Sequence, residues 1–349
     1  MALSKWALAD SQYNETCAHP EVLFYGVYPG YLCEPCWSIA MSSIYYLLLA
    51  AVISQSKAFE FYAYFIGEDL PVTRNVSYFD DIFSAGVTEV IFVGFSLSAD
   101  TTITRTFSNE NELLLARQAA DTHGARVSFV LQSIPFINDG PAAFSKFYAS
   151  ANDMVEKYKF DGINFDWEFP RNVDEWNKYR DLMKGTKENV KKNGRNVNVS
   201  VAIGNSYALY KSVGLCGVVD KCLWMGYDNR GDPRGHSNIY WVKNMVNEWK
   251  NVQGLPPAKF ALGVPLYGEN GAGTQINYFQ LVEMGADPKG NGSFKGYFFD
   301  SQPILQEKID LCNNESLGGL MAWQLGSDLS PEDTRSLIYG IKQKLKPGP

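Results

Sequence analysis

Eight short, largely apolar segments recur along the chain, and each is followed by a stretch with helical or loop character. A strand that is apolar along its whole length is typical of burial on both faces, as in parallel sheets covered by helices. Eight such strand–helix units favour a closed (β/α)8 barrel, the TIM barrel. The alternative is an open doubly wound sheet, which would need a glycine-rich phosphate loop after the first strand, and residues 67–71 (GEDLP) do not supply one. The expected strands occupy residues 59–67, 88–97, 125–133, 162–169, 196–204, 218–227, 259–268 and 318–326.

The chain of 349 residues is longer than this barrel needs. Residues 59–349 have the length of one barrel domain, so we predict a single domain there. The helical segments between the expected strands include residues 112–124, 142–158, 173–192 and 332–345.

The longest apolar run, residues 44–53, lies upstream of the expected barrel. Ten residues are too few to span a bilayer and fit the core of a signal peptide. We therefore predict a secretory signal over residues 41–58, with a buried helix or a short signal anchor as alternatives. Residues 1–40 do not suit a position before a signal, and we interpret them as an extension of the gene model before a start at Met41. The expected product is secreted, or delivered to a lysosomal or other secretory lumen, and free of the membrane after cleavage.

Cysteine usage differs between the two parts of the chain. Cys33-x-x-Cys36, in the upstream part, resembles half a zinc knuckle or a redox pair, but no second half follows. Cys216 and Cys222 lie close enough in sequence to bridge a loop in an oxidising compartment, which leaves Cys312 unpaired.

Several Asn-x-Ser sequons fit a secreted glycoprotein. We predict N-glycosylation at Asn75, Asn291 and Asn314. Asn198 falls in an expected buried strand and is excluded from the prediction.

Charge and histidine content exclude several classes of function. The net charge is −7 and no basic run occurs, so nucleic acid and anionic membranes are not expected partners. Three histidines are too few for a multi-histidine metal centre, and we expect neither a metal nor a cofactor. His123 and His236 are the only histidines after residue 58, and no Gly-x-Ser-x-Gly occurs, so a Ser-His-Asp hydrolase is unsupported.

The stretch Asp-Gly-Ile-Asn-Phe-Asp-Trp-Glu, residues 161–168, carries the pattern that points to chemistry. Side chains alternate between the faces of a strand, so Asn164, Asp166 and Glu168 are expected to face the barrel interior together. Glu168 comes last, at the strand end where barrel active sites lie. Neighbouring carboxylates raise the pKa of one of them, which suits a general acid at neutral pH. The alternative is a hydrogen-bonded polar layer without a catalytic role.

These segments, in their order, resemble glycoside hydrolase family 18, the chitinase family. Its fourth-strand motif is Asp-x-x-Asp-x-Asp-x-Glu, which residues 161–168 match except at Asn164. The match extends over nearly all of residues 59–349. The other similar segments are Tyr64-Phe65 on the first strand, Met-Gly-Tyr-Asp at 225–228, Gly-Val-Pro-Leu-Tyr-Gly at 263–268 and Gly-Gly-Leu-Met-Ala-Trp at 318–323.

The resemblance implies substrate-assisted hydrolysis of N-acetylglucosamine polymers with retention of configuration. Glu168 would protonate the glycosidic oxygen and then activate water, while Asp166 would hold the acetamido N–H and stabilise the positive charge. Tyr227 would orient the acetamido group, and Trp323 would lie under the sugar ring. The remaining implied residues are Asp228, Tyr64 and Tyr267 as substrate contacts, and Asp161 and Asn164 as supporting residues.

Two departures from the family pattern bear on activity. Asn164 cannot ionise, so a relay of three carboxylates becomes one of two. The lysosomal chitobiase-like branch also carries Asn there and is enzymatic. On the third strand, where the family often has Ser-x-Gly-Gly, residues 131–135 read Leu-Gln-Ser-Ile-Pro.

The segment between Tyr267 and Lys295 is only about as long as a helix. We therefore expect no α+β insertion domain after the seventh strand. A shallower groove then favours short oligosaccharides and non-processive cleavage.

The expected activity is hydrolysis of chitin oligosaccharides or chitobiose units by a monomer. A chitinase-like lectin that binds the same sugars without cutting them is the main alternative. A barrel inhibitor or storage protein is a third, if loops fill the groove.

Overall fold

The structure, a computed structural model, describes residues 59–66, 75–107 and 110–345. The expected signal at 41–58, the upstream segment 1–40 and the Cys33–Cys36 pair lie outside the described residues. Among the helices of the described part, none combines the length and the apolar character needed to cross a membrane.

Eight parallel strands close into a barrel, which confirms the predicted TIM fold. Neighbouring strands pair in chain order, and the last strand returns to pair with the first, Phe61 opposite Leu320. A further short strand, β3 (Ile103–Arg105), pairs antiparallel with the second barrel strand. The barrel strands are β1 (Glu60–Ile66), β2 (Glu89–Leu97), β4 (Arg126–Leu131), β5 (Gly162–Phe165), β8 (Asn198–Ile203), β9 (Lys221–Trp224), β10 (Phe260–Pro265) and β15 (Gly319–Trp323).

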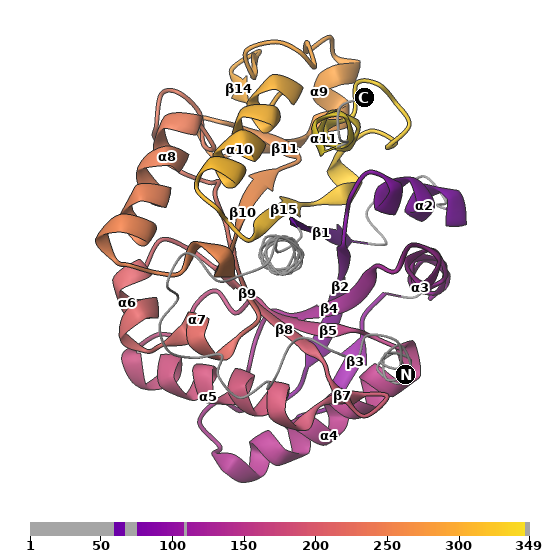
Figure 1. The fold of residues 1–349 in the computed structure, drawn as a ribbon, viewed down its shortest axis with the longest axis vertical. Coiled ribbons are helices and arrows are strands. Elements are labelled where there is room, and N and C mark those ends of the chain that lie inside the picture. The colour runs from indigo at the N-terminus through magenta and orange to yellow at the C-terminus, as the bar shows by residue number, and fades with distance from the viewer. Residues whose placement is uncertain (1–58, 67–74, 108–109, 346–349) are drawn as a thin grey trace, which may run out of the picture. The chain divides into compact units, whose positions relative to one another are not determined.

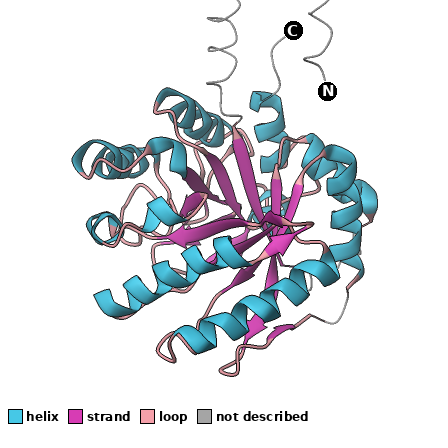
Figure 2. Ribbon diagram, turned by 60° about the horizontal axis from the view of Figure 1, so that its bottom comes forward, coloured by secondary structure: helices cyan, strands magenta, loops and turns pink. Residues whose placement is uncertain are grey.

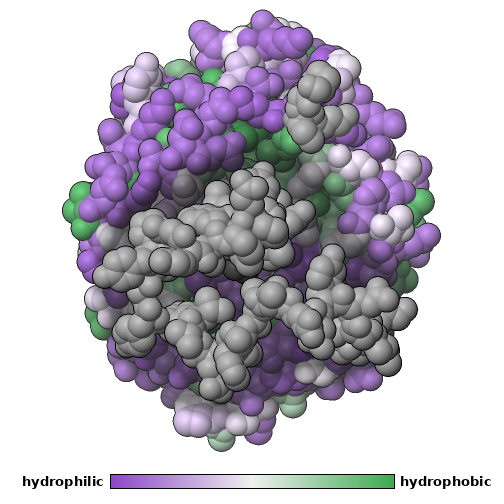
Figure 3. All heavy atoms as spheres, viewed as in Figure 1, coloured by the Kyte–Doolittle hydropathy of each residue, from purple (hydrophilic) through white to green (hydrophobic). Residues whose placement is uncertain are grey.

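Helices surround the barrel as an outer ring (Figures 1 and 2). Apolar side chains from the strands and the inner helix faces form the core between the two layers. The rim of the face in Figure 3 is mostly hydrophilic, as expected where helices turn polar sides to solvent. The ring consists of α2 (Val76–Ser84), α3 (Asn111–His123), α4 (Pro141–Tyr158), α5 (Val173–Asn189), α6 (Tyr207–Ser212), α7 (Leu215–Val218), α8 (Ile239–Asn247), α10 (Gln302–Asn314) and α11 (Leu337–Leu345).

Several predicted elements are shorter than expected, and two of them flank the loop after β5. The strand predicted over 162–169 ends at Phe165, and the residues after it form a loop. The helix predicted over 173–192 ends at Asn189, and a hairpin of β6 (Lys191–Lys192) and β7 (Arg195–Asn196) follows. Its two turn residues, Asn193 and Gly194, have φ of 51° and 74°. Positive φ at both positions is what a two-residue hairpin turn requires, and Asn-Gly supplies it at low cost.

The segment between β10 and α10 is more structured than the predicted helix-length linker. It forms a four-stranded antiparallel sheet with one short helix, α9 (Tyr278–Glu283). This small sheet brings Glu269 and Gln275 to the edge of the barrel mouth. Its strands are β11 (Tyr267–Asn270), β12 (Gln275–Asn277), β13 (Ser293–Phe294) and β14 (Tyr297–Phe298).

The cysteines of the described part are buried free thiols, so the structure does not contain the predicted Cys216–Cys222 bridge. Cys216 on α7 and Cys222 on β9 instead meet as a hydrogen-bonded pair inside the core. Burial and this contact raise the pKa of the Cys222 thiol well above its ordinary value. Both side chains therefore behave as packed apolar groups.

The asparagines of the predicted sequons, Asn75, Asn291 and Asn314, are exposed, whereas Asn198 is partly buried at the start of β8. Glycosylation of the three exposed residues stays a prediction. Asn75 also caps α2, because its side-chain oxygen accepts a hydrogen bond from the backbone N–H of Tyr78.

Candidate active site

An amide that is hydrogen-bonded at both its oxygen and its nitrogen lies inside the barrel at the level of β5. Asn164 is completely buried. Its Oδ1 accepts a hydrogen bond of 2.7 Å from the Tyr64 hydroxyl on β1, and its Nδ2 donates one of 2.8 Å to Ser200 Oγ on β8. Both ends of the amide are thereby fixed. Asn164 joins three strands below the site, and among the described residues its amide makes these hydrogen bonds to Tyr64 and Ser200 rather than one to Asp166.

Asp166 and Glu168 follow β5 and lie in different surroundings. Asp166 is 5% exposed, and its Oδ1 has no hydrogen-bond partner among the described residues. Its Oδ2 accepts one long hydrogen bond, 3.4 Å, from Gln132 Nε2. Burial and the nearby Glu168 charge raise the pKa of Asp166 to about 7. The pKa of Glu168 is raised by partial burial and by the charge of Asp228.

These two carboxyl groups open into one pocket at the carboxyl ends of the strands, which we call the central pocket. Its volume is about 190 Å³. It brings together Asp166, Glu168, Tyr227 and all four residues predicted as substrate contacts. Sequence analysis did not identify the two glutamines in the wall. The lining residues are Tyr64, Gln132, Asp166, Glu168, Ala202, Met225, Tyr227, Asp228, Tyr267, Gln275, Met321 and Trp323.

Asp161 is the predicted supporting residue that the structure places elsewhere. It precedes β5, at the opposite end of the strand from Glu168. Burial acts to raise its pKa, but hydrogen bonds from Lys192, the Val127 backbone N–H and Arg117 hold that pKa below its usual range. The Lys192 and Arg117 contacts are both 2.5 Å. Asp161 therefore ties α3, β4 and the β6–β7 hairpin together and does not line the central pocket.

Aromatic rings form the floor and walls of the central pocket. The Tyr64 and Trp323 ring centroids are 5.1 Å apart, at an interplanar angle of 58°. The Tyr227 ring meets Tyr267 edge-on at 6.1 Å. Within the described part of the chain, the Tyr227 hydroxyl has one hydrogen-bond contact, to the sulfur of Met321 at 3.9 Å. Sulfur is a weak acceptor, so this hydroxyl is available to an oxygen of a bound ligand.

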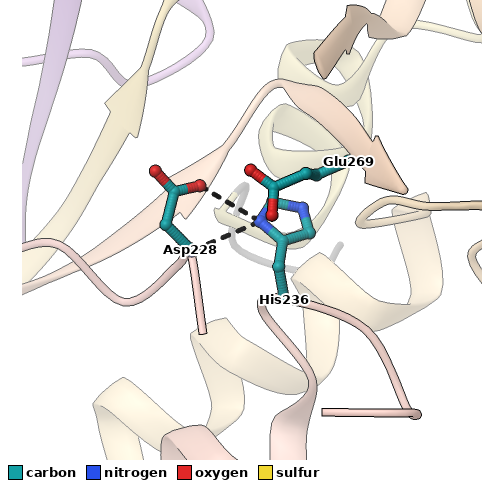
Figure 4. Close-up of side chains that lie close together, drawn as sticks. All are labelled: Asp228, His236 and Glu269. Carbon is teal, nitrogen blue, oxygen red and sulfur yellow. Dashed lines mark hydrogen bonds and ion pairs between the residues drawn. The ribbon is translucent and has the colours of Figure 1, made fainter. Parts of the chain in front are cut away.

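Asp228 is held by its neighbours on one side of the central pocket (Figure 4). Its φ of 59° lies in the left-handed region, which aspartate tolerates better than most residues. His236 Nδ1 is 3.4 Å from Asp228 Oδ1, and the Tyr267 hydroxyl donates to the same oxygen. Burial acts to raise the Asp228 pKa, but hydrogen bonds to His236 and Tyr267 keep it below the ordinary value. Asp228 is therefore a stable negative charge beside Glu168.

The same corner contains the one group of described residues whose ligand atoms lie close enough to hold a metal ion. One atom each from Asp228, His236 and Glu269 lies within 4.8 Å of the others (Figure 4). Arg230 Nη2, however, is 3.3 Å from Glu269 Oε2 and 3.9 Å from Asp228 Oδ2. The guanidinium already supplies the positive charge that these carboxylates need, so the cluster fits an ion-pair network better than a metal site.

A second, larger pocket of about 480 Å³, the side pocket, adjoins the central one. Glu168, Tyr227 and Asp228 line both pockets. The loop after β5 supplies its apolar wall, where Phe169 is 43% exposed and Val173 57% exposed. Alternation along the strand predicted over 162–169 would turn Phe169 toward the helices, but the ring is exposed because the strand ends four residues earlier, at Phe165.

Comparison with known proteins identifies the family of the chain. The family model for glycosyl hydrolases family 18 matches residues 124–328. Endochitinase 1 of Metarhizium anisopliae is 26% identical over 255 residues, which cover 58% of this chain and 60% of that protein. The class V chitinase CHIT5b of Medicago truncatula is 23% identical over 323 residues, covering 74% of this chain and 83% of that one.

The solved structure of a chitinase from Rhizomucor miehei has the same fold. The TM-score is 0.63 at 20% identity, and the superposition covers 81% of this chain and 99% of that one. The family match spans more than half of the chain and includes β5 and the two acidic residues that follow it, Asp166 and Glu168. The chain belongs to glycosyl hydrolase family 18.

Proposed function

We propose that this family member hydrolyses β-1,4-linked N-acetylglucosamine, in chitin oligosaccharides or chitobiose units, by a retaining, substrate-assisted mechanism. The observation that carries the proposal is the carboxyl pair that lines the central pocket together with Trp323. Glu168 reaches the pocket surface and Asp166 lies buried behind it, both with a raised pKa. Two carboxyl groups in unlike surroundings can hold one proton between them at neutral pH.

In the first step, Glu168 gives its proton to the glycosidic oxygen as the bond to C1 breaks. The carbonyl oxygen of the substrate's own acetamido group bonds to C1 from the opposite face, which forms an oxazolinium ion. Water then attacks C1 and loses its proton to the Glu168 carboxylate. The ring opens, and both the acetamido group and the acid are regenerated. Two displacements at C1 give net retention.

Asp166 would accept the acetamido N–H and stabilise the positive charge of the oxazolinium ion. This role needs the ionised form. A donated N–H from the substrate favours that form and leaves the shared proton on Glu168, where the reaction needs it. The free Tyr227 hydroxyl would hold the acetamido carbonyl oxygen in line with C1.

The two pockets would divide the substrate between them. The central pocket, with Trp323 as its floor, would hold the sugar that is attacked, and the side pocket beyond Glu168 would take the leaving part. Short oligosaccharides are the expected substrates. Secretion by the predicted signal is part of the proposal, and the exposure of the three sequon asparagines supports it.

The test is turnover of a fluorogenic chitobioside and chitotrioside between pH 3 and 8. Wild type is expected to cleave them, and Glu168→Gln to lose about 10²- to 10⁴-fold in kcat, the usual contribution of a general acid. Glu283→Gln, which removes an exposed carboxylate on α9 outside both pockets, is the matched control and should retain turnover.

A chitinase-like lectin is the second candidate, and Asn164 in place of the family's Asp is the observation that favours it. Binding of chitotriose by both wild type and Glu168→Gln, with turnover by neither, would establish the lectin and refute the hydrolase.

A further inference from the structure

The Asp166 carboxylate has few partners for a buried acid. Its Oδ1 is unpartnered, and among the described residues Oδ2 has one side-chain donor, Gln132 Nε2. Asn164, two residues earlier, does not fill the gap: its amide's hydrogen bonds among the described residues run to Tyr64 and Ser200, and none of them reaches Asp166. A buried carboxylate is ionised only where hydrogen-bond donors replace the water molecules that would hydrate its charge.

We propose that Gln132 is a positioning residue for this reaction. Its side-chain amide keeps the Asp166 carboxylate ionised and oriented to accept the acetamido N–H of the substrate. The inference rests on the proposed function, since it assigns a role within that mechanism. Gln132 lies in the third-strand segment where the family's Ser-x-Gly-Gly is missing. From the residue after β4 it supplies a contact that Asn164, on β5, does not make.

The backbone explains why an amide at position 132 reaches Asp166. In the β4–β5 register, Val130 lies opposite Asn164 and Leu131 opposite Phe165. Continuing that register puts Gln132 level with Asp166, whose backbone N–H donates to the Leu131 carbonyl at 2.9 Å. Gln132 also lines the central pocket, so its amide approaches Asp166 from the side where the acetamido group would lie.

No cation among the described residues compensates for the Asp166 charge. The ionisable groups that face it are Glu168 on the same loop, Tyr64 on β1, Tyr227 in the loop after β9 and Tyr179 on α5. Glu168 opposes ionisation, and the three buried tyrosines stay neutral. The Gln132 amide is therefore the group that lowers the pKa of Asp166. An amide does not titrate, so its N–H is available at every pH.

The proposal predicts an asymmetric effect on the pH dependence of kcat/KM. The active state has Asp166 ionised and Glu168 protonated. The acid limb reports ionisation of Asp166, which Gln132 favours. The alkaline limb reports deprotonation of Glu168. Asp166 is ionised both before and after Glu168 loses its proton. Removing the Gln132 amide should therefore move the acid limb and leave the alkaline limb in place.

The experiment compares wild type with Gln132→Leu and a matched control, Gln275→Leu. Gln275 also presents an amide to the central pocket, but it donates to Glu269 and not to Asp166. Gln132→Leu should shift the acid limb to higher pH by about 0.5 to 1 unit. This shift is smaller than the loss of a short charge-assisted hydrogen bond would cause, because the contact is long. Gln275→Leu should leave the acid limb where it is in wild type.

A second readout does not depend on turnover. The carboxyl ¹³C signal of Asp166, assigned by its loss in Asp166→Asn, should titrate at higher pH in Gln132→Leu than in wild type. An unchanged titration, or an equal loss of kcat/KM at all pH values, would overturn the positioning role. Absence of turnover in wild type would instead count against the proposed function, and the ¹³C titration would still decide the role of Gln132.

Discussion

Asp166 and Glu168 are two residues apart, yet their surroundings give them different tasks. Asp166 is enclosed by the barrel, which together with the Glu168 charge raises its pKa to about 7. Glu168 reaches the pocket and owes its raised pKa to partial burial and to Asp228. At pH values above both pKa values, both carboxyl groups are charged and Glu168 has no proton to donate. At pH values below both, Asp166 is neutral and cannot stabilise a cation. Activity should therefore have a bell-shaped pH profile.

Asn164→Asp tests how the missing third carboxylate affects that profile. The new side chain would still accept from the Tyr64 hydroxyl but would place a buried acid behind Asp166. A like charge makes ionisation of Asp166 harder, so the acid limb of kcat/KM should move to higher pH, by roughly 1 unit. The measurement is kcat/KM between pH 3 and 8. A profile identical to wild type would show that position 164 does not couple to the catalytic pair.

The site residues that the sequence predicts differ from those it does not predict in the structural elements that position them. Glu168 and Tyr227 lie shortly after barrel strands and Trp323 ends one, so their motifs and the strand-end rule predict one pocket. Gln275 comes from the small sheet after β10, where no motif predicts which side chain turns inward. Gln132 was visible as a departure from the family pattern, but its partner depends on the β4–β5 register.

At the scale of elements, the short length of β5 determines the geometry of the site. Alternation along a longer strand predicts that Phe169 faces the helix layer, but β5 ends at Phe165. The released loop places Glu168 between the two pockets and exposes Phe169 to the side pocket. Alternation identified the inward positions correctly as far as Asp166, and it could not locate the end of the strand.

The exposed ring of Phe169 should contribute to binding of the leaving part of the substrate. Phe169→Ala should raise KM for chitotrioside substrates by about three- to ten-fold, the range expected for one aromatic contact, with a smaller change in kcat. Leu114→Ala, a truncation of an exposed apolar residue on α3 outside both pockets, is the control and should leave KM unchanged. Equal KM values for Phe169→Ala and wild type would exclude Phe169 from the binding surface.

At the scale of the whole molecule, the barrel follows from a repeated pattern and its loops do not. Eight apolar strands alternating with helices leave few topologies, so the closed sheet and its order were predictable from the sequence. The sheet formed by residues 267–298 was not, because its strands are only two to four residues long and carry little periodicity. The Cys216–Cys222 bridge failed as a prediction because spacing in sequence does not show that both thiols are packed in the core.

The measurement that tests the central claim most directly is the anomeric configuration of the first product. Time-resolved ¹H NMR of wild-type enzyme with a short N-acetylchitooligosaccharide separates the two anomers before they equilibrate. Substrate-assisted catalysis by Glu168 and Asp166 predicts that the β-anomer appears first, since retention preserves the configuration of the cleaved bond. Initial release of the α-anomer would show direct attack by water on the glycosidic carbon and would contradict the mechanism.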